Sequence, residues 1–144
     1  MSVEGKFSSF KDVLSGIPQG SVLGPLLFIL FINDLPDYVK SNVKIFADDL
    51  KLIANSSDRE LIESDLRNLE KWEKDWLLQF NLDKCKVLHI IDFNNNQHLN
   101  YVLDGTLMKK SEQEKDLGVL TSGTLLWNDQ IVSCINKGNQ MICW

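Results

Sequence analysis

Phe46-Ala47-Asp48-Asp49 places two adjacent carboxylates between two short apolar runs, and this stretch decides how the rest of the chain is interpreted. Apolar residues alternate over most of both runs, residues 43–47 and 50–54, which is the period of half-buried strands. Two such strands joined by two residues predict a β-hairpin with Asp48 and Asp49 at its turn. Asp-Asp is an unusual pair there, because tight hairpin turns need positive φ angles and favour Asn-Gly or Asp-Gly.

The two adjacent carboxylates carry the first candidate chemistry. Like charges side by side repel, so one of them is expected to hold its proton unless a cation lies between them. Hard divalent cations such as magnesium bind several oxygen ligands, which an Asp pair on a rigid turn supplies. A residue pair that departs from the preference of its turn, as Asp-Asp does here, is typical of a functional site. The plain alternative is that Asp48 and Asp49 are solvated turn residues, a common role for Asp.

Length and composition indicate one compact domain or an incomplete piece of a larger one. The chain has 144 residues, of which 44% are apolar and 24% charged, so a core is expected and disorder is not. The net charge of −5 argues against a general basic surface for nucleic acid, although it leaves a local groove open.

Cysteine usage and hydropathy indicate a soluble intracellular protein, in the nucleus or the cytoplasm. The 3 cysteines are odd in number and not closely spaced, which is typical of reduced thiols rather than a disulfide framework or a zinc site. No secretory signal opens the chain. The longest strongly apolar run, residues 26–32, is far shorter than the roughly 20 residues of a membrane span.

The segment before the hairpin predicts a loop and a buried helix. Residues 15–21 are dense in Gly, Pro and Ser, which is typical of a loop. Pro25 suits the first turn of a helix over the apolar block that follows, with Ser21 or Gly24 as the cap and an end before Pro36. A Gly-rich loop that leads into a helix N-terminus can bind phosphate through its free backbone N–H groups, although most such junctions are only turns between two elements.

The residues after the hairpin predict a long amphipathic helix. Ser57-Asp58-Arg59-Glu60 has the spacing of a capping box at its N-terminus. Charge pairs four residues apart, Glu63/Arg67 and Glu70/Lys74, are expected on its wet side. The apolar stripe expected to cover one face of a sheet consists of Ile62, Leu66, Leu69, Trp72, Trp76, Leu77 and Phe80.

Further strands and a last helix are predicted toward the C-terminus, and a strand or hairpin arm within residues 1–14. Strands are expected over residues 86–91 and 116–120, and Asp104-Gly105 between two short runs is a strong hairpin signal. An amphipathic helix is expected from Leu126 to the end of the chain. His89 and His98 are isolated, so neither a histidine metal site nor a Ser–His nucleophile is supported.

Several motifs in one order resemble a reverse transcriptase, in particular those of non-LTR retrotransposons of the LINE and jockey type. Each motif alone is weak, but the set in this order is specific and covers nearly the whole chain. The motifs are residues 15–28 (SGIPQGSVLGPLLF), 32–35 (INDL), 46–49 (FADD), Phe80-Asn81 with Lys84-Cys85, and 115–119 (KDLGV) followed by Trp127.

The resemblance implies an α+β fold, namely a partial polymerase palm in which helices pack on one face of an antiparallel sheet and the fingers and thumb are largely missing. Residues 1–144 would form one partial reverse transcriptase domain, from the Ser-Gly-x-Pro-Gln-Gly loop through the Asp-Asp hairpin to the start of the thumb. The implied activity is that of an RNA-directed DNA polymerase, a nucleotidyltransferase of transposable elements that uses magnesium or manganese. It copies an RNA template from a DNA primer and dNTPs, and no membrane is involved.

Residue roles follow from the same resemblance. Asp48 and Asp49 match the catalytic metal ligands, Lys84 resembles the lysine near the triphosphate, and Leu117-Gly118 resembles the hairpin that grips the primer end. The two metals of this chemistry lie roughly 3.5–4 Å apart and act on the attacking and leaving oxygens. The residues implied to lie against the incoming nucleotide and the templating base are Gly16, Pro18, Gln19 and Gly20.

One metal-binding Asp of the family has no counterpart here. In the family it lies on a strand well upstream of the Gly-rich loop, and the acids ahead of that loop in this chain, Glu4 and Asp12, fit no matching pattern. Two carboxylates from one turn cannot readily hold two octahedral magnesium ions. We therefore expect weak metal binding and little or no polymerase activity from this chain alone.

Two other interpretations stay open. One is a non-catalytic, retroelement-derived module that contacts nucleic acid or protein. The other is an unstable or untranslated gene-model fragment, in which loss of the upstream strand would expose a sheet edge and favour self-association.

Overall fold

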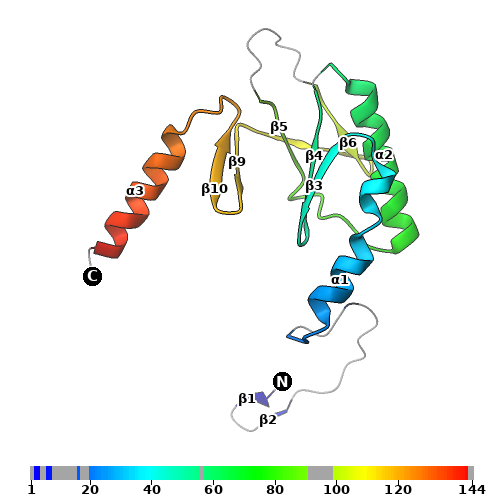
Figure 1. The fold of residues 1–144 in the computed structure, drawn as a ribbon, viewed down its shortest axis with the longest axis horizontal. Helices are drawn as coiled ribbons and strands as arrows, with labels where there is room; N and C mark the ends of the chain where they lie inside the picture. Colours follow the sequence, from blue (N-terminus) through cyan, green and yellow to red (C-terminus); the bar gives the residue numbers. More distant parts are fainter. Residues whose placement is uncertain are drawn as a thin grey trace.

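The computed structural model describes residues 2–3, 6–7, 16, 20–55, 57–90 and 99–142. The described residues form helices and short, mostly antiparallel strand pairs, so the α+β class is confirmed (Figure 1). The helices are α1 (Gly24–Ile32), the short 3₁₀ helix η1 (Leu35–Tyr38), α2 (Arg59–Trp76) and α3 (Asn128–Ile142). The strands are β1 (Ser2–Val3), β2 (Lys6–Phe7), β3 (Asn42–Phe46), β4 (Asp49–Ile53), β5 (Lys86–Leu88), β6 (Val102–Leu103), β7 (Thr106–Leu107), β8 (Lys109–Ser111), β9 (Gln113–Asp116) and β10 (Val119–Ser122).

The strands form separate two-stranded sheets instead of the single antiparallel sheet that the resemblance implies. In the described part of the chain, β1–β2, β3–β4, β6–β7 and β9–β10 are antiparallel hairpins, whereas β5 and β8 pair in parallel. Strands of two to five residues offer few ladder hydrogen bonds, and two-stranded sheets need packing partners to be stable. The β3–β4 and β6–β7 hairpins have such a partner, because Val43, Ile45, Leu50, Leu52 and Leu103 belong to or pack against the core around α2.

The predicted strand over residues 116–120 is a hairpin turn. Leu117 has a φ of 47° and Gly118 a φ of 89°, so both central residues are left-handed, as in a tight primed turn between β9 and β10. Leu117 is an unusual residue for that position, which is why the sequence pattern pointed to a continuous strand. The Asp104-Gly105 hairpin between β6 and β7 is confirmed, with φ angles of 46° and 71°.

The core forms around α2. Its buried residues Leu66, Leu69 and Trp72 belong to the predicted stripe, which is therefore largely confirmed. Leu77 and Phe80 do not continue it, because the helix ends at Trp76: Leu77 takes a φ of 55° and is 89% exposed, and Phe80 packs against the core from the segment that follows. The residues from other elements that complete the buried cluster are Leu35, Val39, Tyr101 and Leu103.

The polar contacts of α2 differ from those predicted. The helix is preceded by Asp58 as N-cap, and no side-chain hydrogen bond caps it, so the capping box does not form. Glu63 pairs with Arg59, one turn before it, at 2.7 Å between Oε1 and Nε, and not with the predicted Arg67, one turn after it. Glu70 Oε1 accepts the backbone N–H of Asp104 at 2.6 Å, which ties the helix to the β6–β7 turn.

A buried carboxylate joins α2 to the start of β3. Asp65 is 0% exposed, and its two oxygens accept the backbone N–H groups of Lys40 at 2.9 Å and Ser41 at 2.8 Å. Burial raises the pKa of Asp65, but the hydrogen bonds from Ser41 and Lys40 lower it more, so it lies below its usual value. The carboxylate therefore fixes the point at which the chain enters the Asp-Asp hairpin.

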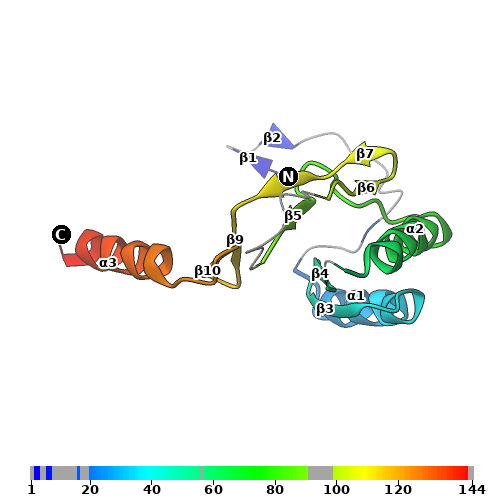
Figure 2. The ribbon, with the colours of Figure 1, turned by 90° about the horizontal axis from the view of Figure 1, so that it is seen from above.

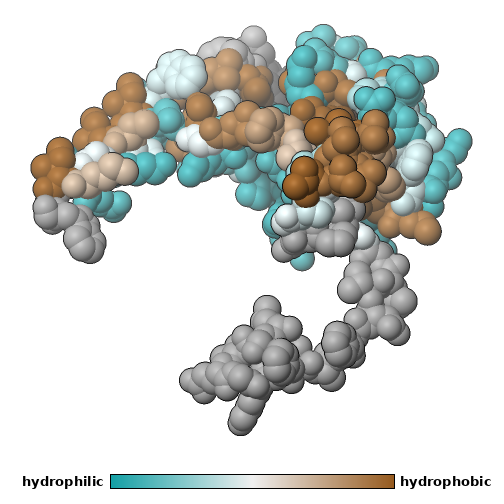
Figure 3. Space-filling view, turned by 60° about the horizontal axis from the view of Figure 1, so that its bottom comes forward, coloured by the Kyte–Doolittle hydropathy of each residue, from teal (hydrophilic) through white to brown (hydrophobic). Residues whose placement is uncertain are grey.

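α1 forms where it is predicted but is not buried. It begins at Gly24, with Pro25 in its first turn and the N–H of Gly24 donated to Ser21 Oγ at 3.0 Å, and it ends at Ile32. Only Phe31 packs against the core through ring contacts with Trp72 and Trp76. The brown patch on the right of Figure 3 lies over this helix, whose exposed residues include Leu26, Leu27, Ile29 and Leu30, each between 47% and 64% exposed. None of the described helices is both long and apolar enough to cross a membrane.

Candidate functional site

The turn of the β3–β4 hairpin begins one residue earlier than predicted. Phe46 pairs with Asp49, so Ala47 and Asp48 are the two turn residues and Asp49 is the first residue of β4. Ala47 has a φ of 51°, a left-handed conformation that is costly for a residue with a Cβ. Both carboxylates are exposed. The hairpin therefore holds two adjacent acids outward on a tight, strained turn.

The two faces of this hairpin have different environments. Val43 and Ile45 are half-buried and pack against the core cluster, as the alternation predicts. Asp49 lies opposite Phe46, which is 62% exposed, and Lys51 follows two residues later on the same face of β4. The inner face anchors the hairpin, and the outer face presents the acids.

The structure brings a second predicted element to this outer face. The Nζ of Lys51 forms an ion pair with Oδ2 of Asp116, the last residue of β9. Leu117 and Gly118 follow Asp116 directly and form the β9–β10 turn, where Leu117 is 62% exposed. The primer-grip-like turn and the Asp-Asp hairpin are thus linked through one side-chain contact.

Lys84 is not brought into contact with the acids. It lies exposed in the turn before β5, where its backbone N–H donates to the Asn81 carbonyl at 2.9 Å. Its side chain makes no ion pair with any described residue. The next residue, Cys85, is half-buried, and burial together with the charge of Glu73 raises its pKa. The triphosphate role of Lys84 stays a prediction.

The predicted nucleotide-binding loop is described at its two glycines only. Gly16 has a φ of 93° and Gly20 a φ of 81°, and among the described residues no atom lies within 4 Å of a Cβ built on either. The positive φ of both residues is a backbone conformation that glycine adopts readily. Pro18 and Gln19 lie outside the described residues.

One polar contact near the site has no local sequence signal. Asp34 Oδ1 accepts the indole N–H of Trp72 at 3.1 Å, across 38 positions of sequence. Trp72 is 0% exposed and contacts Phe31, Trp76 and Phe80 through its ring, so this bond closes an aromatic cluster between α1 and α2.

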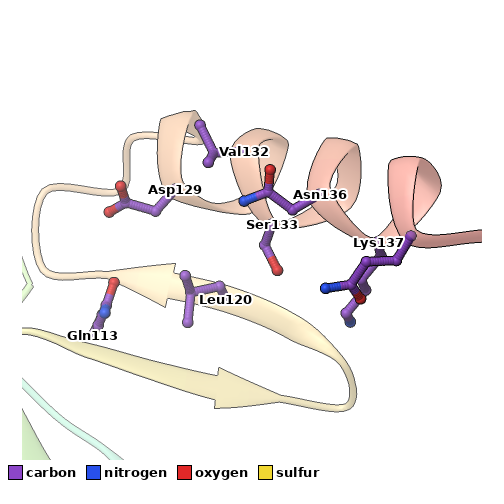
Figure 4. Close-up of a pocket in the computed structure, with 8 residues that line it drawn as sticks. Gln113, Leu120, Asp129, Val132, Ser133, Asn136 and Lys137 are labelled. Carbon is purple, nitrogen blue, oxygen red and sulfur yellow. The ribbon is translucent and has the colours of Figure 1, made fainter. Parts of the chain in front are cut away.

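The described residues do not complete a metal site. Asp48 and Asp49 offer the oxygen donors that magnesium prefers, but no group of three or more His, Cys, Asp or Glu residues lies close enough together to hold an ion in this part of the chain. A cavity of about 380 Å³ lies between the β9–β10 hairpin and α3 (Figure 4). It is lined by residues such as Gln113, Leu120 and Lys137 and by none of the Asp-Asp hairpin.

Comparison with known proteins fixes the family of this chain. The family model described as reverse transcriptase (RNA-dependent DNA polymerase) matches residues 2–121. The chain belongs to the reverse transcriptase family. That match spans the Gly-rich loop, the Asp-Asp hairpin and the Leu117-Gly118 turn.

Curated relatives place these motifs in mobile elements. The chain is 26% identical over 145 residues to the RNA-directed DNA polymerase from mobile element jockey of Drosophila melanogaster. This alignment covers 92% of the chain and 16% of the relative. It is 27% identical over 147 residues to the jockey polymerase of Drosophila funebris, with the same coverage. It is 32% identical over 134 residues to the probable RNA-directed DNA polymerase from transposon BS of Drosophila melanogaster, covering 81% of the chain and 14% of the relative.

The predicted resemblance to jockey-type reverse transcriptases is confirmed by these matches. The chain spans only about 16% of the length of the jockey polymerases. No solved structure gives a significant match.

Proposed function

We propose that this chain is part of the palm of a retrotransposon reverse transcriptase and carries two of the acids for template-directed DNA synthesis. The observation that carries the proposal is the exposed Asp48-Asp49 pair on a strained hairpin turn, within a chain that the family model matches. In this reaction a primer 3′-hydroxyl attacks the α-phosphate of a dNTP, and pyrophosphate leaves. The family reaction uses divalent metal, either magnesium or manganese.

The contribution of this chain to that reaction is positioning. The packed inner face of β3 and the buried Asp65 fix the hairpin, so that Asp48 and Asp49 are held outward without reorganisation. Gly16, Pro18, Gln19 and Gly20 are proposed for the nucleotide and template. Lys84 is proposed to contact the triphosphate, and Leu117-Gly118 to hold the primer end. Their support is the resemblance of Lys84-Cys85 and of residues 115–119 to motifs of the family.

We further propose that this chain alone is inactive and binds metal weakly. Two carboxylates supply too few ligands for two octahedral ions, and the described residues add no third. Primer extension with the purified chain, an RNA template and magnesium or manganese tests this. We expect no template-dependent product. Synthesis that disappears in Asp48→Ala would overturn the proposed inactivity.

Metal titration tests separately whether Asp48 and Asp49 bind a divalent ion. A rise in melting temperature with manganese that is lost in Asp48→Asn supports metal binding at the turn. Asp83→Asn is the matched control, because Asp83 lies on another turn and its side chain is 95% exposed. An equal loss in both variants would show that the ion binds the surface generally.

The second candidate function is a non-catalytic module that contacts nucleic acid or protein. The incomplete ligand set and the exposed apolar helix α1 favour it. For nucleic acid, the discriminating result is an affinity that falls steeply with salt but is unchanged in Asp48→Asn. An affinity that depends on the Asp pair and on divalent metal supports the polymerase fragment instead.

We also propose that copies of this chain associate with one another. The described sheets have two strands each and therefore leave edges unpaired, and α1 presents leucine and isoleucine side chains to solvent. Contiguous apolar patches of this kind are rare on monomers unless they bind something.

A further inference from the structure

Two acidic residues on one face of β9 each contact a lysine of a different element. Glu114 and Asp116 are two residues apart on the strand and therefore point the same way, and both are half-buried while Gln113 and Lys115 are exposed. Glu114 Oε1 lies 2.8 Å from Lys86 Nζ of β5. Asp116 pairs with Lys51 of β4. One face of β9 therefore meets both the β5 strand and the Asp-Asp hairpin through charge.

Apolar packing does not hold the β9–β10 hairpin in place. Among the described residues, the core cluster and the side chains packed against it come from positions 31–108, so no side chain of β9, β10 or α3 belongs to them. α3 contacts β10, where the N–H of Leu120 donates to Gln130 Oε1 at 2.8 Å. In both Figure 1 and Figure 2, α3 and the β9–β10 hairpin extend away from α1 and α2. This hairpin depends on other contacts for its position.

The base of the hairpin has one close backbone contact. The N–H of Gly123 donates to the Glu112 carbonyl at 2.9 Å, and a Cβ built on Gly123 would lie 2.5 Å from the carbonyl oxygen of His89. Only glycine allows this approach. The hairpin is thus packed at its base beside the end of β5, and its other end is held by Glu114 and Asp116.

We propose that the ion pairs Lys51–Asp116 and Lys86–Glu114 form a two-point latch that positions the Leu117-Gly118 turn relative to the Asp48-Asp49 turn. Lys51 follows Asp49 by two residues on one face of β4, and Asp116 directly precedes Leu117. The Lys51–Asp116 pair therefore joins the two turns by a short path. The Lys86–Glu114 pair fixes a second point on β9, so that the β9–β10 hairpin cannot rotate about the first pair. Its importance for primer placement rests on the proposed function, whereas the latch itself is a property of this chain.

The exposure of these pairs suits positioning more than stability. The four side chains are between 36% and 42% exposed, and ion pairs that are this accessible contribute little to the free energy of unfolding and are screened by salt. The contact with Lys86 also lowers the pKa of Glu114 more than burial raises it, so the acid stays charged at neutral pH. Loss of the latch should release the hairpin without unfolding the core.

A spin-label distance measurement tests the latch. Ketone-bearing residues introduced at Asn42 and Lys115, both exposed and outside the pairs, carry the labels without involving the native cysteines. Labelled chain is diluted with excess unlabelled chain, so that only distances within one molecule are measured. We expect a narrow distribution in the parent protein, and at least a twofold broader one in Glu114→Gln/Asp116→Asn or at high salt. The urea midpoint should stay unchanged.

Matched variants make the result specific. Glu112→Gln removes one exposed acid just before β9 and should leave the distribution narrow. The exchange Lys51→Asp/Asp116→Lys should restore a narrow distribution, which a general loss of charge would not. An unchanged distribution in the double variant would overturn the latch. A latch that responds as expected, together with a salt-sensitive nucleic-acid affinity that is unchanged in Asp48→Asn, would instead count against the proposed function alone.

Discussion

Ala47 carries the conformational strain of the candidate site. Its φ of 51° is a left-handed conformation that costs about 1–2 kcal/mol for a residue with a Cβ, whereas glycine adopts it freely. Strain of this kind persists only where the surrounding structure fixes it, and it is typical of functional turns. Here the half-buried inner face of β3 and the buried Asp65 supply that constraint.

We expect Ala47→Gly to stabilise the folded chain. Relief of the left-handed strain is offset by the greater freedom of glycine in the unfolded chain, which leaves a net gain of about 0.5–1 kcal/mol. Urea unfolding measures it. Ala54→Gly is the control, because Ala54 has no positive φ and its replacement should destabilise the chain. A loss of stability in Ala47→Gly would show that the turn is unstrained.

Asp65 should make stability depend on pH in the acid range. Its folded-state pKa lies below that of the unfolded chain, so its contribution is full above the unfolded-state pKa and is lost as the pH falls through the folded-state pKa. Removing a charged acceptor of two backbone N–H groups should cost about 2 kcal/mol at pH 7. We expect Asp65→Asn to show that loss.

The measurement is urea unfolding from pH 7 to pH 3. The gap between parent and Asp65→Asn should narrow as the pH drops below about 4, near the ordinary pKa of Asp. Asp75→Asn, on the exposed part of the same helix, should show no comparable loss at any pH. A gap that is constant with pH would contradict a lowered pKa.

At the scale of elements, the sequence predicted what depends on local patterning. The β3–β4 hairpin, α1 and the stripe on α2 follow from alternation, Pro25 and helical spacing, and all three form. Two turns were wrongly predicted, each at a residue that does not favour the positive φ it takes, whereas the turn at Asp104, where Asp-Gly favours a positive φ, was predicted correctly. Ala47 shifts the first turn by one residue, and Leu117 turns a predicted strand into a hairpin. Neither residue has a local preference that announces this.

The junction between α1 and α2 depends on Trp72. Its indole N–H donates to Asp34 at 3.1 Å, and its buried ring contacts Phe31, Trp76 and Phe80. Trp72→Phe keeps a ring but removes the donor and part of the packing, so we expect a loss of about 2 kcal/mol in the free energy of unfolding. Urea unfolding followed by circular dichroism measures it.

A second tryptophan provides the control. Trp127 is 62% exposed, so Trp127→Phe should change stability by less than about 0.5 kcal/mol. Equal effects of the two substitutions would show that the cluster around Trp72 does not stabilise the junction.

At the scale of the whole molecule, the site could be predicted only in pieces. The Asp pair could be located from its residues and the Leu117-Gly118 turn only from the family resemblance, and their link through Lys51 and Asp116 joins positions far apart in the chain and has no local signal. The burial of α1 was predicted from its composition and is wrong, because composition shows that a helix is apolar but not what covers it. The number of metal ligands could not be predicted from the sequence either, since it depends on which acids the fold brings together.

The exposed face of α1 makes association between copies a testable consequence. Ile29 and Leu30 are 60% and 64% exposed, and full burial of each such side chain contributes about 1.5–3 kcal/mol. Since about 1.4 kcal/mol is a tenfold change in affinity, Ile29→Glu/Leu30→Glu should weaken association at least tenfold if α1 lies in the contact. Light scattering over a range of concentrations measures it, with the urea midpoint as a check on the fold.

Ile135→Glu, on the exposed α3, is the control for apolar surface in general. A parent chain that is monomeric at every concentration, or a double variant that associates as the parent does, would show that α1 does not mediate contact between copies.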